Sequence, residues 1–344
     1  MKKLGREPRK LETLNLFSLL QRDDGSTLYD PGNHASFFAQ VNSGLTEALD
    51  SESTLHGMRI QSLFAGMVAN LGKAQLLKEE DSGVCYYEGD DLCLPDFRIV
   101  TTSGDVMLVE TKNHFSKKGM SPFRIRRSDL DGLERYAKLV GTPLKIAVYW
   151  AGWNLWTLND AASFAGNRNY AELEFRVAAM QSEMAALGDF MIGTKYPLVL
   201  RLIAATDKPR SISADGVASI HFKGFEIRCA DTLIEDKTEQ NIALYLMMYG
   251  KWEYDGGYIE FDDSGLPAAA VHTVSPDEIT PNQGFEIIGS LSSLYSQLYN
   301  ALTLEEGKVT RLRLTDPTAI APIIPLQHEK KSLPLWRFVQ TANF

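Results

Sequence analysis

The sequence predicts an α/β protein in which a mixed central sheet is flanked by helices and an additional α+β C-terminal domain follows. Three observations predict this class. Apolar residues recur at helical spacing between Met58 and Leu71. Two aliphatic segments then flank a turn-rich connection, as in a β-hairpin. After a second helical pattern, the mostly apolar segment Leu144–Trp150 has the composition of a buried strand.

The first helix of this series carries one apolar stripe. Its members are Met58, Ile60, Leu63, Phe64, Met67, Val68 and Leu71. Gly72 provides a C-terminal stop. The segment Gln75–Glu80 that follows is expected to form a short first strand.

The hairpin and the second helix come next. The two strands are expected at Leu94–Val100 and Val106–Lys112, joined by the turn-rich segment Thr101–Asp105. Ser128 or Asp129 is expected to cap the helix. The apolar positions of that helix are Leu130, Leu133, Tyr136, Ala137 and Val140, and its end is expected at Gly141 and Pro143.

Three charged residues lie at strand ends that would otherwise be apolar. Asp96 follows Pro95 near the start of the first hairpin strand, and the second strand ends in Glu110, Thr111 and Lys112. Residues two apart in a strand point to the same face, so Lys112 shares a face with Glu110, and Asp96 can lie beside Glu110 across the hairpin. Two close carboxylates repel each other unless a counter-charge is present. Mg²⁺ can supply that charge, because it binds carboxylate oxygens and retains several waters.

The pattern Pro95-Asp96, thirteen intervening residues and Glu110-Thr111-Lys112 resembles the PD-(D/E)XK, or restriction-endonuclease-like, nuclease superfamily. The resemblance implies a restriction-endonuclease-like core and metal-dependent cleavage of nucleic acid. It implies that Asp96 and Glu110 ligate Mg²⁺, with Mn²⁺ as a substitute and the Thr111 backbone carbonyl as a third ligand. Lys112 would position the attacking water, while the metal would stabilise charge on a phosphate oxygen.

The tripeptide alone has little specificity. The chain contains three more Glu-x-Lys sequences, which begin at Glu235, Glu306 and Glu329. The copy at Glu110 differs from them because it ends an aliphatic run and follows a Pro-Asp strand through a short turn. An ordinary hairpin with a solvated charge pair is the alternative interpretation.

The sequence departs from the superfamily in one respect. Many members carry a further glutamate on the first helix, but the stretch from Gly57 to Phe64 contains no acidic residue. Gln61, Glu80 and Glu47 are candidate sources of the missing oxygen ligand. The alternative for each is a polar position on the surface.

Positive charge is concentrated directly after Lys112. The whole chain carries a net charge of −9, yet residues 112–145 contain nine cations and three acids, a net charge of +6. A basic segment beside a metal site suits a phosphate backbone, although a solvated loop and helix face would look the same. The candidate nucleic-acid contacts are Lys117, Lys118, Arg124, Arg126 and Arg127, with His114 as a further candidate.

Length and composition predict a multi-part protein. At 344 residues the chain exceeds the usual size of one domain. We expect a helical accessory region at 1–55, the nuclease core at 56–165 and an α+β domain without an assigned role at 166–344. No segment is long and apolar enough for a membrane span or a secretory signal. The three cysteines form no Cys-x-x-Cys pair, which argues against a disulfide framework or zinc site and favours a cytoplasmic location.

Outside the core, helices are expected at 11–20 and 34–49. The C-terminal expectations are a helix at 171–187, a strand at 196–204, a helix at 239–249, a hairpin at 252–274, a helix at 285–302 and an ordered tail at 317–336. The helix and hairpin between residues 239 and 274 suggest a winged helix, although that helix has few cations.

The function expected from these observations is that of a Mg²⁺-dependent endonuclease acting on DNA. By analogy alone, such an enzyme could serve restriction, phage defence or a mobile element. The sequence contains no Walker loop, zinc-protease helix, nucleophile elbow or dinucleotide fingerprint. Two alternatives stay open, namely a catalytically inactive nuclease-fold protein that binds DNA or acts as a scaffold, and an RNA-directed nuclease. A protein partner or a homo-oligomer also stays open.

Overall fold

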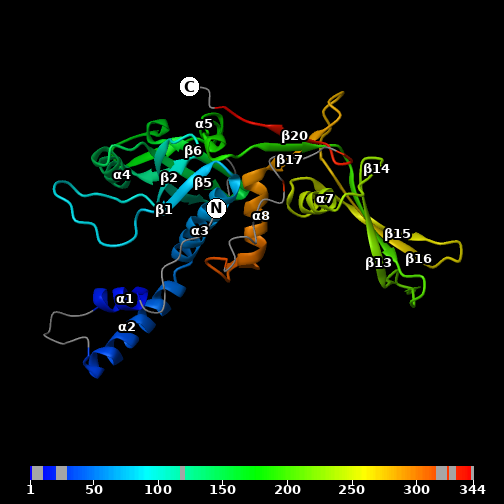
Figure 1. Ribbon diagram of the computed structural model, residues 1–344, viewed down its shortest axis with the longest axis horizontal. Helices are drawn as coiled ribbons and strands as arrows, with labels where there is room; N and C mark the ends of the chain where they lie inside the picture. The colour runs from blue at the N-terminus through cyan, green and yellow to red at the C-terminus, as the bar shows by residue number, and fades with distance from the viewer. Residues whose placement is uncertain (2–10, 21–28, 117–120, 315–323, 325–330, 342–344) are drawn as a thin grey trace.

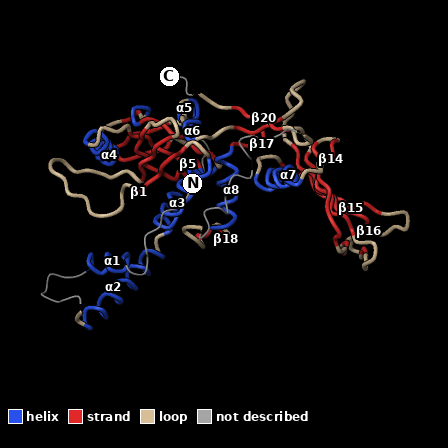
Figure 2. The backbone as a smooth tube through the Cα atoms, in the orientation of Figure 1, coloured by secondary structure: helices blue, strands red, loops and turns tan. Residues whose placement is uncertain are grey.

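A computed structural model describes residues 1, 11–20, 29–116, 121–314, 324 and 331–341 of the chain. Figure 1 shows a body built around one sheet, a pair of N-terminal helices that projects from it on one side, and a long twisted sheet that projects on the other. In Figure 2 the first projection is helical and the second consists of strands.

The sheet of the body has the strand order β1-β2-β3-β5-β6. Its strands are β1 (Ala74–Glu79), β2 (Phe97–Thr101), β3 (Val106–His114), β5 (Leu144–Trp150) and β6 (Leu155–Asp160). The β3–β5 pair is parallel, and the other neighbouring pairs are antiparallel. The sheet is therefore mixed, as predicted, and β2 and β3 form the expected hairpin.

Helix α3 (Glu52–Leu71) covers one face of this sheet. It begins at the N-cap Ser51, whose hydroxyl accepts a hydrogen bond from the Thr54 N–H at 3.4 Å. It ends at Gly72, whose φ of 92° is readily adopted by glycine. The predicted stripe faces inward from Ile60 onward, and its buried members are Ile60, Leu63, Phe64, Met67, Val68 and Leu71. Met58 was also predicted to belong to it but is exposed.

Helix α4 (Arg127–Leu139) covers the opposite face, where Leu130 and Leu133 share a buried cluster with Leu108 and Ile146. The prediction that Ser128 or Asp129 caps this helix was wrong. Strand β4 (Phe123–Arg126) continues directly into the helix, so both residues already lie in its first turn.

The first free N–H of α4 is bonded from outside the helix. The Arg127 N–H donates to the Asn169 carbonyl at 2.9 Å. A side-chain cap is therefore not needed for this donor.

The N-terminal projection, here called the arm, consists of α1 (Thr13–Leu20) and α2 (Pro31–Leu49). Helix α2 starts three residues before the predicted position, because Asp30 caps it and Pro31 occupies its first turn. The two helices meet where Phe17 packs edge-on against Phe37, with ring centroids 5.2 Å apart.

Three further sheets of three or more strands have the orders β14-β13-β10-β16-β15, β17-β9-β20 and β4-β8-β7. The first two are formed by the second half of the chain, and the third contains β4 of the body. The elements after β5, besides β6, are η2 (Ala151–Trp153), η3 (Ala161–Ser163), β7 (Ala165–Gly166), β8 (Tyr170–Leu173), α5 (Phe175–Met180), α6 (Met184–Leu187), β9 (Met191–Thr194), β10 (Leu198–Ala204), β11 (Ser211–Ile212), β12 (Ala218–Ser219), β13 (Phe222–Cys229), β14 (Thr232–Leu233), α7 (Lys237–Tyr249), β15 (Glu253–Phe261), β16 (Pro267–Ser275), β17 (Glu286–Ser290), α8 (Leu291–Thr303), β18 (Leu304–Glu305), β19 (Lys308–Val309) and β20 (Leu335–Phe338).

Two helix predictions in the second half of the chain were wrong, the first in its type of structure and the second in its start. Residues 171–187 form the end of β8 and two short helices, because Ile125 of β4 pairs with Ala171 and the Ser182 hydroxyl accepts the Leu158 N–H at 3.2 Å. The helix predicted at 285–302 starts only at Leu291, since a capping box at Ser290 separates it from β17.

The winged-helix interpretation was also wrong. The predicted hairpin exists as β15 and β16, but β16 pairs along its length with β10. The hairpin is thus part of a five-stranded sheet. The predicted tail at 317–336 lies mostly outside the described residues, and its end contributes Leu335 and Trp336 to β20.

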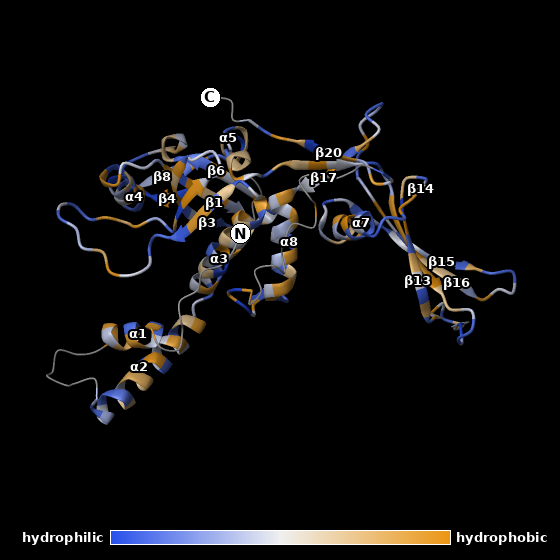
Figure 3. Ribbon diagram, viewed as in Figure 1, coloured by the Kyte–Doolittle hydropathy of each residue, from blue (hydrophilic) through white to orange (hydrophobic). Residues whose placement is uncertain are grey.

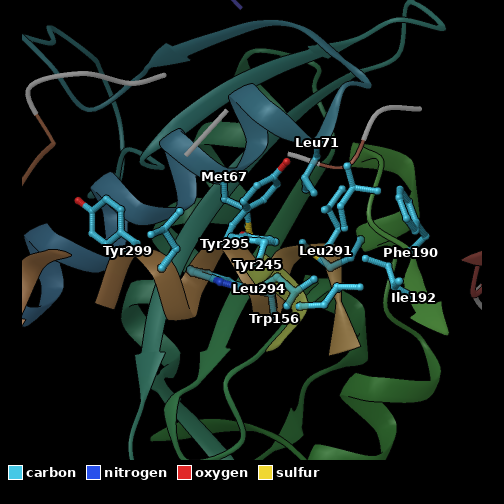
Figure 4. Packing of buried hydrophobic residues seen from close by; sticks show 14 of the residues in the cluster. Met67, Leu71, Trp156, Phe190, Ile192, Tyr245, Leu291, Leu294, Tyr295 and Tyr299 are labelled. Atoms are coloured by element: carbon cyan, nitrogen blue, oxygen red, sulfur yellow. The ribbon is translucent and has the colours of Figure 1, made fainter. Parts of the chain in front are cut away.

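A single buried cluster joins the body to the second half of the chain. Figure 4 shows that Met67 of α3 and Trp156 of β6 pack near Tyr245 of α7 and Tyr295 of α8. Helix α8 lies between α3 and α7 and touches both. The domain boundary expected after residue 165 stays a prediction, and the cluster runs across it.

None of the helices in the described ranges combines the length and the hydropathy that a bilayer crossing requires.

We expect Gly132→Ala to destabilise the protein by about 1–3 kcal/mol, a typical cost of overpacking. Gly132 faces Cys93 from within α4, and an added Cβ would lie 2.8 Å from the Cys93 Sγ and 3.0 Å from its backbone nitrogen. Urea unfolding of both proteins measures the difference.

The matched control is Gly57→Ala in α3, where an added Cβ meets nothing within 4 Å. This change should leave stability unchanged or raise it by up to about 1 kcal/mol, because alanine favours the helix. Equal effects of the two substitutions would show that α4 does not pack against Cys93 as described.

Candidate active site

The register of β2 against β3 places the predicted residues next to one another. Phe97 is opposite Val109, so Asp96, one residue before β2, lies beside Glu110. The Asp96 N–H donates to Glu110 Oε2 at 3.2 Å. Lys112 lies two residues further along β3, and its ammonium donates to Glu110 Oε1. The three residues that the motif predicts are therefore in contact at one end of the hairpin.

Thr111 holds the other carboxylate. Its N–H donates to Asp96 Oδ2 at 2.6 Å, and its hydroxyl donates to the same oxygen. Backbone and side chain of one residue thus fix the direction of the Asp96 carboxylate. Since Thr111 lies between Glu110 and Lys112, one strand orients all the charged groups of the site.

Burial dominates the electrostatics of these groups. Glu110 is 8% exposed, and burial raises its pKa to about 7 against the opposing effect of the Lys112 ammonium. Burial also raises the pKa of Asp96, although hydrogen bonds from Thr111 oppose the shift. Desolvation disfavours the Lys112 ammonium, but the Glu110 carboxylate outweighs it and raises the pKa of Lys112. A half-buried and a buried carboxylate therefore lie near a single ammonium, which is bonded to Glu110.

Gln61 of α3 reaches this site, but it does so through its amide nitrogen and not as the oxygen ligand considered from the sequence. Its Nε2 donates to Asp96 Oδ1 at 3.0 Å and to Asp81 Oδ2 at 3.3 Å. The amide is thus oriented as a hydrogen-bond donor that links two carboxylates. Asp81, which sequence reasoning missed, is an exposed residue just after β1. The acidic run Glu79-Glu80-Asp81 was the available signal for it.

Glu80 and Glu47 have other partners. Glu80 Oε1 accepts hydrogen bonds from Arg98 Nη2 at 2.5 Å and from the Tyr136 hydroxyl at 2.6 Å. Glu47 lies on α2 of the arm, where it accepts a hydrogen bond from Ser43 at 3.1 Å. Within the described residues, neither side chain forms a hydrogen bond or an ion pair with Asp96 or Glu110.

The donor set at Asp96 and Glu110 suits a hard cation that keeps much of its water. In the part of the chain that the structure describes, no three His, Cys, Asp or Glu side chains are grouped so that they could hold a metal by themselves. Mg²⁺ is commonly held by one or two carboxylates together with waters. Two neighbouring carboxylates with raised pKa values beside one ammonium fit the binding of such an ion. The Thr111 carbonyl stays a predicted third ligand.

The basic residues of the predicted nucleic-acid surface are only partly placed. Lys117 and Lys118 lie outside the described residues. Arg124 and Arg126 alternate with buried residues on β4 and point outward. Arg124 forms an ion pair with Glu172 at 2.9 Å, while Arg127 is partly buried at the start of α4.

His114 is held within the protein. Its ring packs edge-on against Trp150, with centroids 5.0 Å apart, and its Nε2 lies 3.0 Å from the Ser121 carbonyl. Burial lowers the pKa of His114. Its contact with a phosphate stays a prediction.

Comparisons with known proteins identify a distant structural similarity. No protein family and no curated protein sequence matches the chain. Among solved structures, the chain is similar to a Holliday junction resolvase from the archaeal hyperthermophile Archaeoglobus fulgidus, with a TM-score of 0.30 and 12% sequence identity. The match covers 39% of this chain and 96% of the resolvase chain. A likeness this distant carries no functional argument, which must come from the site itself.

We expect Gln61→Glu to lower the melting temperature of the metal-free protein and to increase its stabilisation by Mg²⁺. The change removes a donor to Asp96 and Asp81 and places a third carboxylate between them. Thermal unfolding in EDTA and in Mg²⁺ measures both effects, and ligand binding to the folded state appears as a shift in melting temperature.

Gln75→Glu on the exposed face of β1 is the control with the same change of charge. It should respond to Mg²⁺ as the unchanged protein does. If the two variants behave alike, Gln61 does not lie between the carboxylates.

Proposed function

We propose that the protein is a metal-dependent endonuclease that hydrolyses phosphodiester bonds of DNA. The observation that carries this proposal is the contact among Asp96, Glu110 and Lys112 at one end of the β2–β3 hairpin. Neighbouring strands of a helix-covered sheet support these residues, so the groups are held on rigid elements, as a catalytic site requires.

Asp96 and Glu110 would hold the metal, Mg²⁺ or its substitute Mn²⁺, together with the Thr111 carbonyl. When bound, a divalent cation polarises a phosphate oxygen and lowers the pKa of a water ligand. Thr111 directs the Asp96 carboxylate through two hydrogen bonds to one of its oxygens. Gln61 restrains the other oxygen of Asp96.

Lys112 would act through its charge. Because its pKa is raised by the Glu110 carboxylate, the amine is protonated at neutral pH and donates hydrogen bonds. Its side chain is 36% exposed, so solvent and substrate can reach it. We infer that it orients the attacking water and offsets negative charge that develops on the phosphate. Products with 5′-phosphate and 3′-hydroxyl ends follow from the superfamily resemblance.

The substrate proposal rests on charge. Arg126 projects from β4 into solvent, close in sequence to the end of β3, and Arg124 points the same way. Duplex DNA offers a regular row of phosphates to such a surface. A role in restriction, phage defence or a mobile element is an extension of this proposal by analogy.

Lys112→Ala should reduce cleavage of supercoiled plasmid at least about 100-fold, within the range typical of a catalytic group that moves or orients a proton. The assay compares the two proteins in Mg²⁺, Mn²⁺ and EDTA, and cleavage should require the metal. The control is Lys237→Ala, since Lys237 ends another Glu-x-Lys sequence at the exposed start of α7.

Lys237→Ala should cleave as the unchanged protein does. Equal cleavage by the Lys112→Ala variant would contradict the assigned role. Absence of cleavage by the unchanged protein, combined with calorimetric Mg²⁺ binding that Asp96→Ala abolishes, would favour the inactive alternative below.

Arg126→Ala should weaken DNA binding and reduce the slope of log affinity against log salt by about 1, the effect of losing one phosphate contact. Fluorescence anisotropy with a labelled duplex at several salt concentrations measures it. Arg201→Ala is the control, because Arg201 is engaged with Glu226 and Glu260 in the second sheet. A slope that is unchanged by Arg126→Ala would remove β4 from the proposed DNA surface.

One observation favours a catalytically inactive nuclease-fold protein that binds DNA or acts as a scaffold. On α3, an amide donor at Gln61 faces Asp96 where many superfamily members carry a glutamate. DNA binding that is accompanied by no cleavage in Mg²⁺ and none in Mn²⁺ would support this second candidate.

A further inference from the structure

The arm buries little of its own apolar surface. Within its described helices, Phe17 and Phe37 are the buried side chains. Phe38, Leu45 and Leu49 of α2 are 67%, 57% and 58% exposed. Figure 1 shows the arm projecting from the N-terminal end of α3, away from the sheet that carries the candidate active site.

Helix α2 nevertheless has a well-defined apolar stripe. At 100° per residue, Phe37, Phe38, Val41, Leu45, Ala48 and Leu49 fall within about one third of its circumference. Ser43, Thr46 and Glu47 lie on the remaining surface. Figure 3 shows apolar residues along both helices of the arm. Sequence periodicity thus supplies a packing face, of which α1 covers the end at Phe37.

An exposed apolar helix face of this kind is expected to pack against another surface. In water, helices of this kind gain most of their stability from packing an amphipathic face rather than from intrinsic propensity. Leu14, Leu16 and Leu19 of α1 are also 58%, 42% and 69% exposed. These side chains add to the apolar surface that the arm exposes to water.

The absence of cations from the two helices of the arm restricts the kinds of partner that can bind to them. Residues 11–20 and 29–49 contain no lysine or arginine. Phosphate groups of nucleic acid would find no cation there, and helices that lie on anionic membranes usually carry lysine or arginine on their polar face. An apolar protein surface is therefore the occupant that suits these two helices.

We propose that this occupant is the same arm of a second copy, so that the protein is a two-fold symmetric dimer through α2. A two-fold interface brings a surface against itself, which requires the surface to be self-complementary. An uncharged apolar stripe meets that requirement without like-charge repulsion. The net charge of −9 of the whole chain disfavours self-contact through charged surfaces.

The stripe also has the symmetry that such a contact needs. In an antiparallel pairing of two α2 helices, Val41 of one copy would face Leu45 of the second copy. Phe38 would face Ala48 in the same register, while Phe37 stays covered by Phe17 of α1. The projection of the arm in Figure 1 keeps the two acidic bodies apart in this arrangement.

Leu45→Glu tests the proposal by placing two unpaired carboxylates in the dimer contact. The dissociation constant of the dimer should rise at least about 100-fold, because unpaired carboxylates buried in the contact weaken association. Sedimentation velocity over a concentration series measures it on the full chain without DNA or metal. The unchanged protein should sediment as a dimer of 38.3 kDa chains.

Ser43→Glu, on the polar side of the same helix, is the matched control and should stay dimeric. Leu45 is 57% exposed in a single chain, so its substitution should leave the circular dichroism spectrum unchanged. A monomeric unchanged protein, or a dimer that Leu45→Glu does not weaken, would overturn the proposal. A monomer whose arm resists proteolysis would indicate that the chain covers its own stripe.

The dimer proposal does not depend on nuclease activity, and the measurement of mass tests it separately. If both proposals hold, a dimer brings two active sites, one for each strand of a duplex. Leu45→Glu should then shift plasmid products from linear DNA toward nicked circles at concentrations where that variant is monomeric. Nicking by the variant would show at the same time that its active site is intact.

Discussion

The pairing of β2 with β3 is the constraint on which the site and much of the body depend. With Phe97 opposite Val109, both side chains enter the core beneath α3, and Asp96 meets Glu110 at the end of the hairpin. A slip of one residue would turn every side chain of the strand to the other face. The apolar core and the charged site therefore demand the same register, and each one stabilises the arrangement that the other requires.

Helix α8 extends this dependence to the second half of the chain. It packs between α3 and α7. The half-buried Asp189 carboxylate accepts hydrogen bonds at the N-terminus of α8 from the Ser292 N–H at 2.9 Å and from the Ser292 hydroxyl at 2.6 Å. Trp156 of β6 donates to Ser296 of α8 at 3.0 Å. The sheet that supports the candidate active site is thus backed by residues more than a hundred positions away in the sequence. Changes in α8 are expected to reach the site through α3.

Local patterns predicted the body well. The stripe of α3, its stop at Gly72 and the strand Leu144–Trp150 are determined by spacing and by residues with strong local preferences. The prediction failed where a distant partner decided the outcome. Residues 171–173 have the composition of a helix but pair with β4, and the β15–β16 hairpin joins β10 instead of standing beside α7 as a wing.

The sequence by itself determined the identity and the order of the charged residues of the site, because Asp96, Glu110 and Lys112 are fixed by strand periodicity and one short turn. Tertiary structure decided what surrounds them. Gln61 and Asp81 lie 35 and 15 positions before Asp96, and only the packing of α3 against the sheet brings the amide between the two carboxylates. Burial in the folded protein likewise raises the pKa of Glu110. Such contacts between distant segments depend on packing geometry, which no local pattern of residues specifies.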